Sequence, residues 1–123
     1  MGTSNYATLD DCLHGFQNTF NANENVKKLV RGWDRSIVVE ATDTESVLTV
    51  IVNDLLIKAI KAGSDGEDFD SVIHLQASEE NLIRIFSGDY NPANALIDGE
   101  LAVFSSEKDK VKLEAISMVI WGM

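Results

Sequence analysis

The sequence has one cysteine, no long apolar run and half as many basic as acidic residues, and each shortage excludes a class of protein. Cys12 alone can form neither an intrachain disulfide nor a cysteine-based zinc site, and its place on the apolar side of a helical pattern predicts a buried thiol. No apolar run reaches membrane-spanning length, and no signal-peptide pattern is present. We therefore expect a cytoplasmic protein without stable membrane insertion.

The scarcity of positive charge limits the partners of the protein. Ten lysines and arginines against twenty aspartates and glutamates give a net charge of −10 and a pI near 4.4. Such a surface repels phosphate backbones and anionic lipid, so it disfavours nucleic-acid binding. The alternative interpretation is that the charge only keeps the protein in solution.

The length and composition are those of one globular domain. The chain has 123 residues, of which 45% are hydrophobic and 24% charged. A chain of this length buries about two-thirds of the surface that its unfolded form exposes, which allows a real core. We expect a flexible tail over residues 1–8 and a single domain over residues 9–123.

The spacing of apolar residues changes along the chain and predicts the order of helices and strands. A helical period predicts helices over 9–21 and from Asn23 to Gly32, and a period of two then predicts strands over 36–42, 46–52, 55–62 and 71–77. Helices over 79–87, 92–98 and 107–121 and a strand over 100–104 follow. This order predicts an α+β fold, in which about five helices gather on one face of a five-stranded, mainly antiparallel sheet.

Alternation along the strands separates the two faces of the predicted sheet. One face is uniformly apolar and consists of Ile37, Val39, Ala41, Leu48, Val50, Val52, Ile73, Leu75 and Ala77. The opposite face holds polar residues but also Val38, Val47, Ile51 and Ile60. If these four formed a contiguous patch, it would serve a homodimer or an enzyme partner.

No arrangement of residues predicts catalysis or metal binding. His14 and His74 have no carboxylate or cysteine at ligand spacing, so we interpret both as structural or solvated histidines. The acidic loop over residues 63–70 lacks the EF-hand pattern and is interpreted as a solvated loop rather than a calcium site. No phosphate-binding glycine loop and no nucleophile elbow is present. We therefore expect no enzyme, no cofactor and no metal.

The most distinctive stretch runs from Ser78 to Phe104. Ser78 can cap a helix that Gly88 ends, and Asn91 with Pro92 can start another that Gly99 ends, before a strand begins. This pattern resembles the sterol carrier protein domain, the type-two non-specific lipid transfer family. The resemblance extends over residues 9–121 and is most specific at 71–104. The chain departs from the family pattern at 104–106, where Phe-Ser-Ser replaces a glycine and an acidic residue.

The resemblance implies a function. Members hold an apolar tunnel between sheet and helices, where they bind fatty acids, acyl esters, sterol-like molecules or phospholipids without covalent chemistry, and the last helix commonly closes one end. Carried onto this sequence, the implied lining is Val50, Val52, Ile73, Leu75, Leu82, Ile85, Phe86, Leu96, Leu101, Val103, Ile116, Val119 and Ile120. The alternative is a filled-core module that dimerises or docks in an enzyme complex, since periodicity alone does not distinguish a cavity from a close-packed core.

Overall fold

The computed structural model describes residues 8–63 and 72–122. The predicted tail before Thr8 and most of the predicted acidic loop lie outside the described residues. The elements, in chain order, are α1 (Leu9–Ala22), α2 (Glu24–Leu29), β1 (Arg35–Ala41), β2 (Val47–Asn53), β3 (Leu56–Ala62), β4 (Val72–Ala77), α3 (Glu79–Phe86), α4 (Pro92–Ile97), β5 (Ala102–Phe104) and α5 (Glu107–Trp121).

The strands form a single five-stranded sheet in the order β3-β2-β1-β4-β5. Three of the four neighbouring pairs are antiparallel, and β1 and β4 run parallel. The parallel pair arises because the chain leaves β1 through the β2–β3 hairpin and returns to the other edge of β1. The predicted α+β fold with a mainly antiparallel sheet is confirmed.

Hydroxyl side chains cap the N-termini of three helices at the positions that the sequence predicts. The Oγ1 of Thr8 accepts a hydrogen bond from the backbone N–H of Asp11 over 3.1 Å. The Oγ of Ser78 accepts one from the N–H of Asn81 over 3.2 Å, and the Oγ of Ser106 accepts one from the N–H of Asp109 over 3.2 Å. Each cap pairs a backbone donor that the first helical turn leaves without a partner.

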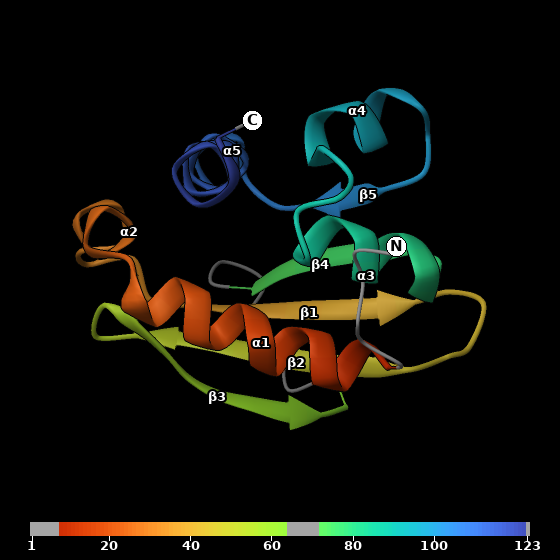
Figure 1. Ribbon diagram of the computed structural model, residues 1–123, viewed down its shortest axis with the longest axis horizontal. Helices are drawn as coiled ribbons and strands as arrows, with labels where there is room; N and C mark the ends of the chain where they lie inside the picture. The colour runs from red at the N-terminus through yellow and green to blue at the C-terminus, as the bar shows by residue number, and fades with distance from the viewer. Residues whose placement is uncertain (1–7, 64–71, 123) are drawn as a thin grey trace.

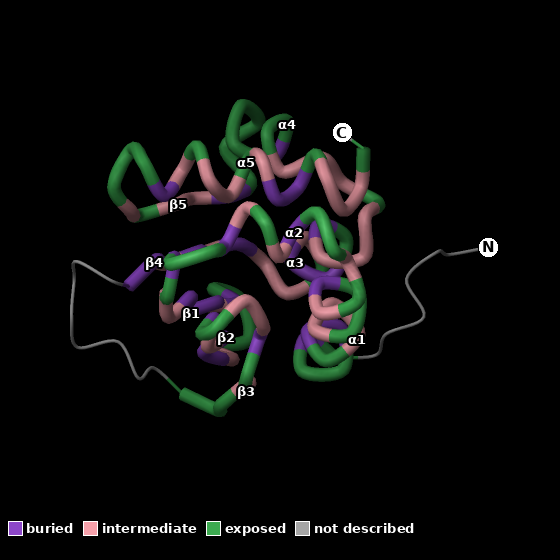
Figure 2. The backbone as a smooth tube through the Cα atoms, turned by 90° about the vertical axis from the view of Figure 1, so that its left-hand side faces the viewer, coloured by how far each residue is buried: buried purple, intermediate pink, exposed green. Residues whose placement is uncertain are grey.

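The main core lies between the sheet and the helices that cover one of its faces (Figure 1). α1 crosses in front of β1–β3, α3 packs beside α1, and α4 and α5 lie at the β5 end of the sheet. In Figure 2 the buried segments face one another across the space between the strands and α1 and α3. All nine residues that alternation assigns to the apolar face belong to this core.

The outer face of the sheet differs from the prediction. Ile60 does not lie there, because it pairs with Val50 and packs against the core. The cause is an irregularity in the β2–β3 pairing: Val52 pairs with Ile57 and Ile51 with Ala59, so Lys58 is an extra residue that reverses the alternation of β3.

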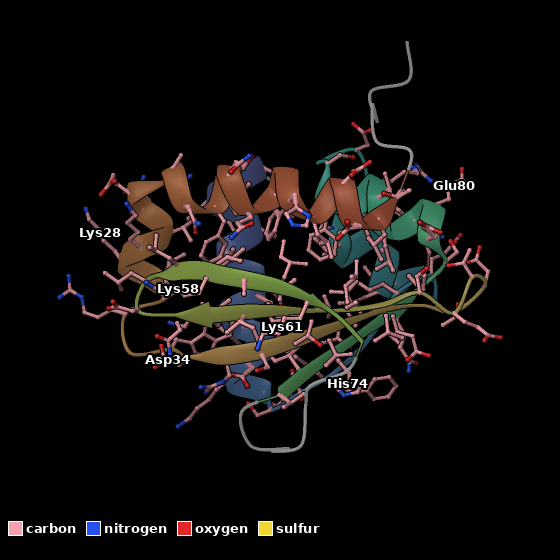
Figure 3. All side chains as sticks on the ribbon, turned by 90° about the horizontal axis from the view of Figure 1, so that it is seen from below. Lys28, Asp34, Lys58, Lys61, His74 and Glu80 are labelled. Atoms are coloured by element: carbon pink, nitrogen blue, oxygen red, sulfur yellow. The ribbon has the colours of Figure 1, made fainter. Side chains whose placement is uncertain are left out.

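The predicted patch on the outer face is therefore not formed. Val38 is only 1% exposed, between its cross-strand neighbours Thr49 and His74. Val47 and Ile51 are half-buried. Seen from below, His74 points to the side of the sheet away from α1 (Figure 3), as the alternation predicts. This geometry does not support docking through a contiguous apolar surface of Val38, Val47, Ile51 and Ile60.

Polar contacts of two α5 residues, Asp109 and Lys112, hold the helix over the rest of the fold. The carboxylate of Asp109, which is 3% exposed, accepts hydrogen bonds from the indole Nε1–H of Trp33 over 2.8 Å and from the Nε–H of Arg35 over 3.1 Å. The ammonium group of Lys112 donates to the backbone carbonyl of Leu29 over 2.7 Å. Because these partners lie in or after α2, they fix the first half of α5 relative to the α2–β1 segment.

Candidate functional site

A cavity of about 320 Å³ lies between α5 and the part of the fold formed by β4, β5, α3 and α4. Most of its lining is apolar. The lining residues are Phe16, Leu75, Leu82, Ile85, Phe86, Asn91, Pro92, Ala93, Leu96, Leu101, Val103, Lys110, Leu113, Glu114, Ile116, Ser117, Met118 and Trp121. Leu96 is 43% exposed and Met118 62% exposed, so the rim between α4 and α5 reaches the surface.

One long side of the cavity is a stripe along α5. Residues 110, 113, 114, 117, 118 and 121 all line it, at the three- and four-residue spacing that places side chains on one helical face. The stripe starts with the charged side chain of Lys110 and ends with the indole of Trp121. Ile116 of α5 also lines the cavity, whereas Val111 on another side of the helix is 64% exposed.

Aromatic side chains from three helices meet at one end of the cavity. The ring of Phe16 in α1 lies edge-on to Phe86 in α3, with centroids 5.0 Å apart and planes at 70°. The same ring lies 5.6 Å from the ring of Trp121 in α5. These separations are within the range in which aromatic pairs attract one another. We call Phe16, Phe86 and Trp121 the aromatic cluster.

Few polar groups enter the lining, and two of them are already hydrogen-bonded within the protein. The Oδ1 of Asn91 accepts from the backbone N–H of Ala93 and so caps α4. The Oγ of Ser117 donates to the backbone carbonyl of Glu114 over 3.1 Å. The remaining polar lining residues, Lys110 and Glu114, are charged. The cavity thus presents a largely apolar wall with its charges on α5.

The predicted lining residues divide into two groups. Eight of them line the cavity: Leu75, Leu82, Ile85, Phe86, Leu96, Leu101, Val103 and Ile116. Five do not: Val50, Val52, Ile73, Val119 and Ile120. Val50, Val52 and Ile73 belong to the core, and Val119 and Ile120 pack against it. The cavity therefore reaches the sheet at β4 and β5 rather than at its middle strands.

Several lining residues were not predicted, among them three large side chains from α1 and α5. Phe16, Leu113 and Trp121 each stand at helical spacing with other apolar residues, which is the signal of a core position. The same spacing holds for cavity and core, so no local pattern separates the two. Lys110 and Glu114 carry no distinguishing signal either, because the same helix also holds the charged residues Glu107, Lys108, Asp109 and Lys112.

Cys12 is buried, as predicted, with its thiol close to a backbone carbonyl group. Its Sγ lies 3.6 Å from the backbone carbonyl oxygen of Ile83. Burial, with a smaller contribution from the negative charge of Asp89, raises the pKa of the Cys12 thiol to about 11. The thiol is therefore protonated near neutral pH and is a poor nucleophile.

The described residues contain no group of three or more histidine, cysteine or acidic side chains placed to hold a metal ion. His14 is an exposed residue of α1 whose Nδ1 lies 2.9 Å from the carbonyl oxygen of Asp10. In the same part of the chain, no helix is long and apolar enough to cross a membrane.

Several solved structures share this fold. A palmitated SCP2L2 from Aedes aegypti has a TM-score of 0.62, is 10% identical and covers 89% of this chain and 94% of its own. The sterol carrier protein domain 2 of Helicoverpa armigera has a TM-score of 0.61, is 18% identical and covers 93% of this chain and 87% of its own. The chain therefore has the sterol carrier protein fold, as the stretch from Ser78 to Phe104 predicts.

The same fold also occurs inside a larger enzyme. A stereoselective inverting sec-alkylsulfatase from a Pseudomonas species matches with a TM-score of 0.60 and 14% identity over 76% of this chain. This chain spans only 14% of the length of that enzyme. No protein-family model and no curated protein matches the sequence.

Proposed function

We propose that the protein binds and carries a hydrophobic ligand with an acyl chain, without catalysing a reaction on it. The observation that carries this proposal is the cavity of about 320 Å³ between α5 and the β4–β5 end of the sheet, with its largely apolar lining. This volume is at the lower end of the range of about 300–1,000 Å³ for small-molecule sites.

Burial of apolar surface would supply most of the affinity. Each methylene that leaves water contributes about 0.8 kcal/mol, so a chain of moderate length binds without many polar contacts. Selectivity among chain lengths would be weak, because one methylene in an apolar pocket is worth only about 1–3 kcal/mol. The likeness to a palmitated protein of the same fold supports an acyl ligand in particular.

Native mass spectrometry of the purified protein, followed by solvent extraction and lipid analysis, tests the proposal. We expect a mass in excess of the 13.5 kDa chain and an extracted lipid that accounts for it. A fluorescent fatty acid should also bind and be displaced by unlabelled fatty acid. Recovery of bare protein together with no binding of the fluorescent probe at micromolar concentrations would overturn carriage.

A second candidate function is that of a module in an enzyme assembly. The occurrence of this fold within a sulfatase, of which it makes up a small part, favours this candidate. The apolar face predicted for docking is not formed, so a partner would have to use another surface. Sedimentation of the protein at high concentration tests self-assembly, and a single monomer mass would count against a homodimer.

A further inference from the structure

The cavity has a charged end and an aromatic end. Among the described residues that line it, Lys110 is the one basic side chain. Trp121 lies eleven residues further along α5, which corresponds to about 16 Å at a rise of 1.5 Å per residue. Trp121 belongs to the aromatic cluster, so the cavity wall changes from charged to purely apolar along the helix.

The ammonium group of Lys110 is only weakly held by the protein. Its ion pair with Glu107 joins Nζ and Oε1 atoms 3.7 Å apart, which is beyond hydrogen-bond distance. The side chain of Glu107 is 89% exposed and that of Lys110 is 40% exposed, so water screens this pair. A ligand carboxylate in the cavity would therefore displace a weak contact rather than a buried one.

We infer that the ligand is an unesterified fatty acid, bound with its carboxylate against the Nζ of Lys110 and its methyl end at the aromatic cluster. This inference rests on the proposed function and adds the headgroup and the orientation. A neutral sterol, an alcohol or a neutral ester gains nothing from the charge of Lys110. Glu114, one turn further along the stripe, repels the carboxylate and reduces the preference without reversing it, because its exposed side chain is well screened.

Calorimetric titrations with dodecanoic acid and with dodecanol test the headgroup, because the two ligands share a chain and differ in charge. The wild-type protein should bind the acid more tightly than the alcohol. Lys110→Met should weaken binding of the acid by about three- to tenfold and leave binding of the alcohol unchanged. Lys108→Met is the matched control, since Lys108 is an exposed residue of the same helix and does not line the cavity. Glu114→Gln should strengthen binding of the acid and leave binding of the alcohol unchanged.

The outcomes separate this inference from the proposed function. Equal affinity of the wild-type protein for acid and alcohol, or an equal loss of both in Lys110→Met, overturns the assignment of the headgroup while carriage stands. Failure of the wild-type protein to bind either ligand overturns the proposed function and this inference with it. If Lys108→Met loses as much affinity for the acid as Lys110→Met does, the effect is one of general charge, and the assignment of the headgroup is likewise overturned.

Discussion

Gly88 and Trp121 lie so close together that even a Cβ atom at position 88 would require a neighbouring atom to move. A Cβ atom added to Gly88 would lie 2.8 Å from the Cδ1 of the Trp121 indole, a distance that such atoms do not reach without movement. Gly88 also has a φ of +87°, in the left-handed region. The end of α3 and the end of α5 are therefore fitted to one another at the aromatic end of the cavity.

Gly88→Ala should destabilise the protein and move Trp121. The left-handed backbone alone costs an alanine about 1–2 kcal/mol, and displacement of the indole adds to this cost. Gly99→Ala is the matched control, because Gly99 has a φ of +76° but no atom within 4 Å of an added Cβ. Urea unfolding should show a larger loss for Gly88→Ala than for Gly99→Ala. Equal losses of stability would show that the indole of Trp121 moves aside without destabilising the protein.

Phe86→Ala should change the preference of the cavity for acyl chains of different length. Removal of the ring from the aromatic cluster enlarges the cavity, so longer acyl chains should gain affinity relative to shorter ones. Phe20 is 2% exposed and does not line the cavity, so Phe20→Ala should cost about 3–5 kcal/mol of stability without a change in chain-length preference. Binding series with fatty acids of increasing length check both variants. An unchanged series in Phe86→Ala would contradict its place in the lining.

The contacts of Asp109 should make stability depend on acidic pH. Burial acts to raise the pKa of this carboxyl, but the hydrogen bonds from Trp33 and Arg35 outweigh it and hold the pKa below its usual value. Since the folded pKa lies below the unfolded value of about 3.9, the stabilisation is present above about pH 4 and is lost as the pH falls through the folded pKa.

Asp109→Asn should lower the free energy of unfolding by about 1–3 kcal/mol near neutral pH. In this variant, stability should also fall less steeply as the pH decreases. Denaturant midpoints measured between about pH 7 and pH 2 check this expectation. Glu107→Gln, an exposed change on the same helix, should leave the acid slope as in the wild-type protein. An acid slope that is equally steep in Asp109→Asn would refute the role of Asp109.

Cys12 should react with thiol reagents only after the protein unfolds. Its thiol is buried and its pKa of about 11 leaves little thiolate near neutral pH. Labelling in buffer should be slow, and labelling in concentrated urea should be fast and complete. Rapid modification of the folded protein would show that α1 and α3 separate readily.

Local chemistry made much of the fold predictable. The caps at Ser78 and Ser106 act within a single helical turn, so the sequence around them is enough to locate the starts of α3 and α5. The apolar face of the sheet follows from alternation for the same reason. Ile60 was misplaced because the extra residue at Lys58 reverses the alternation, and nothing in the local pattern indicates it.

The candidate site was less predictable, because its contacts join distant parts of the chain. The carboxylate of Asp109, which helps to hold α5 in place, accepts a hydrogen bond from Trp33, 76 residues away in the sequence. Val50 and Phe86 both fit the pattern of a buried apolar residue, yet Val50 packs in the core while Phe86 lines the cavity. Which apolar residues face a space depends on how α5 is held over the sheet.

The most direct test of carriage is to place a larger side chain inside the cavity. Ser117 lines the cavity and is 9% exposed, so Ser117→Phe should occupy the space that an acyl chain would take, whereas Ser117→Ala removes only the hydroxyl. Calorimetric titration of dodecanoic acid should give saturable binding to the wild-type protein and to Ser117→Ala. It should give binding at least about tenfold weaker to Ser117→Phe, provided that its circular dichroism stays native. Equal binding by a folded Ser117→Phe, or none by the wild-type protein, would contradict carriage in this cavity.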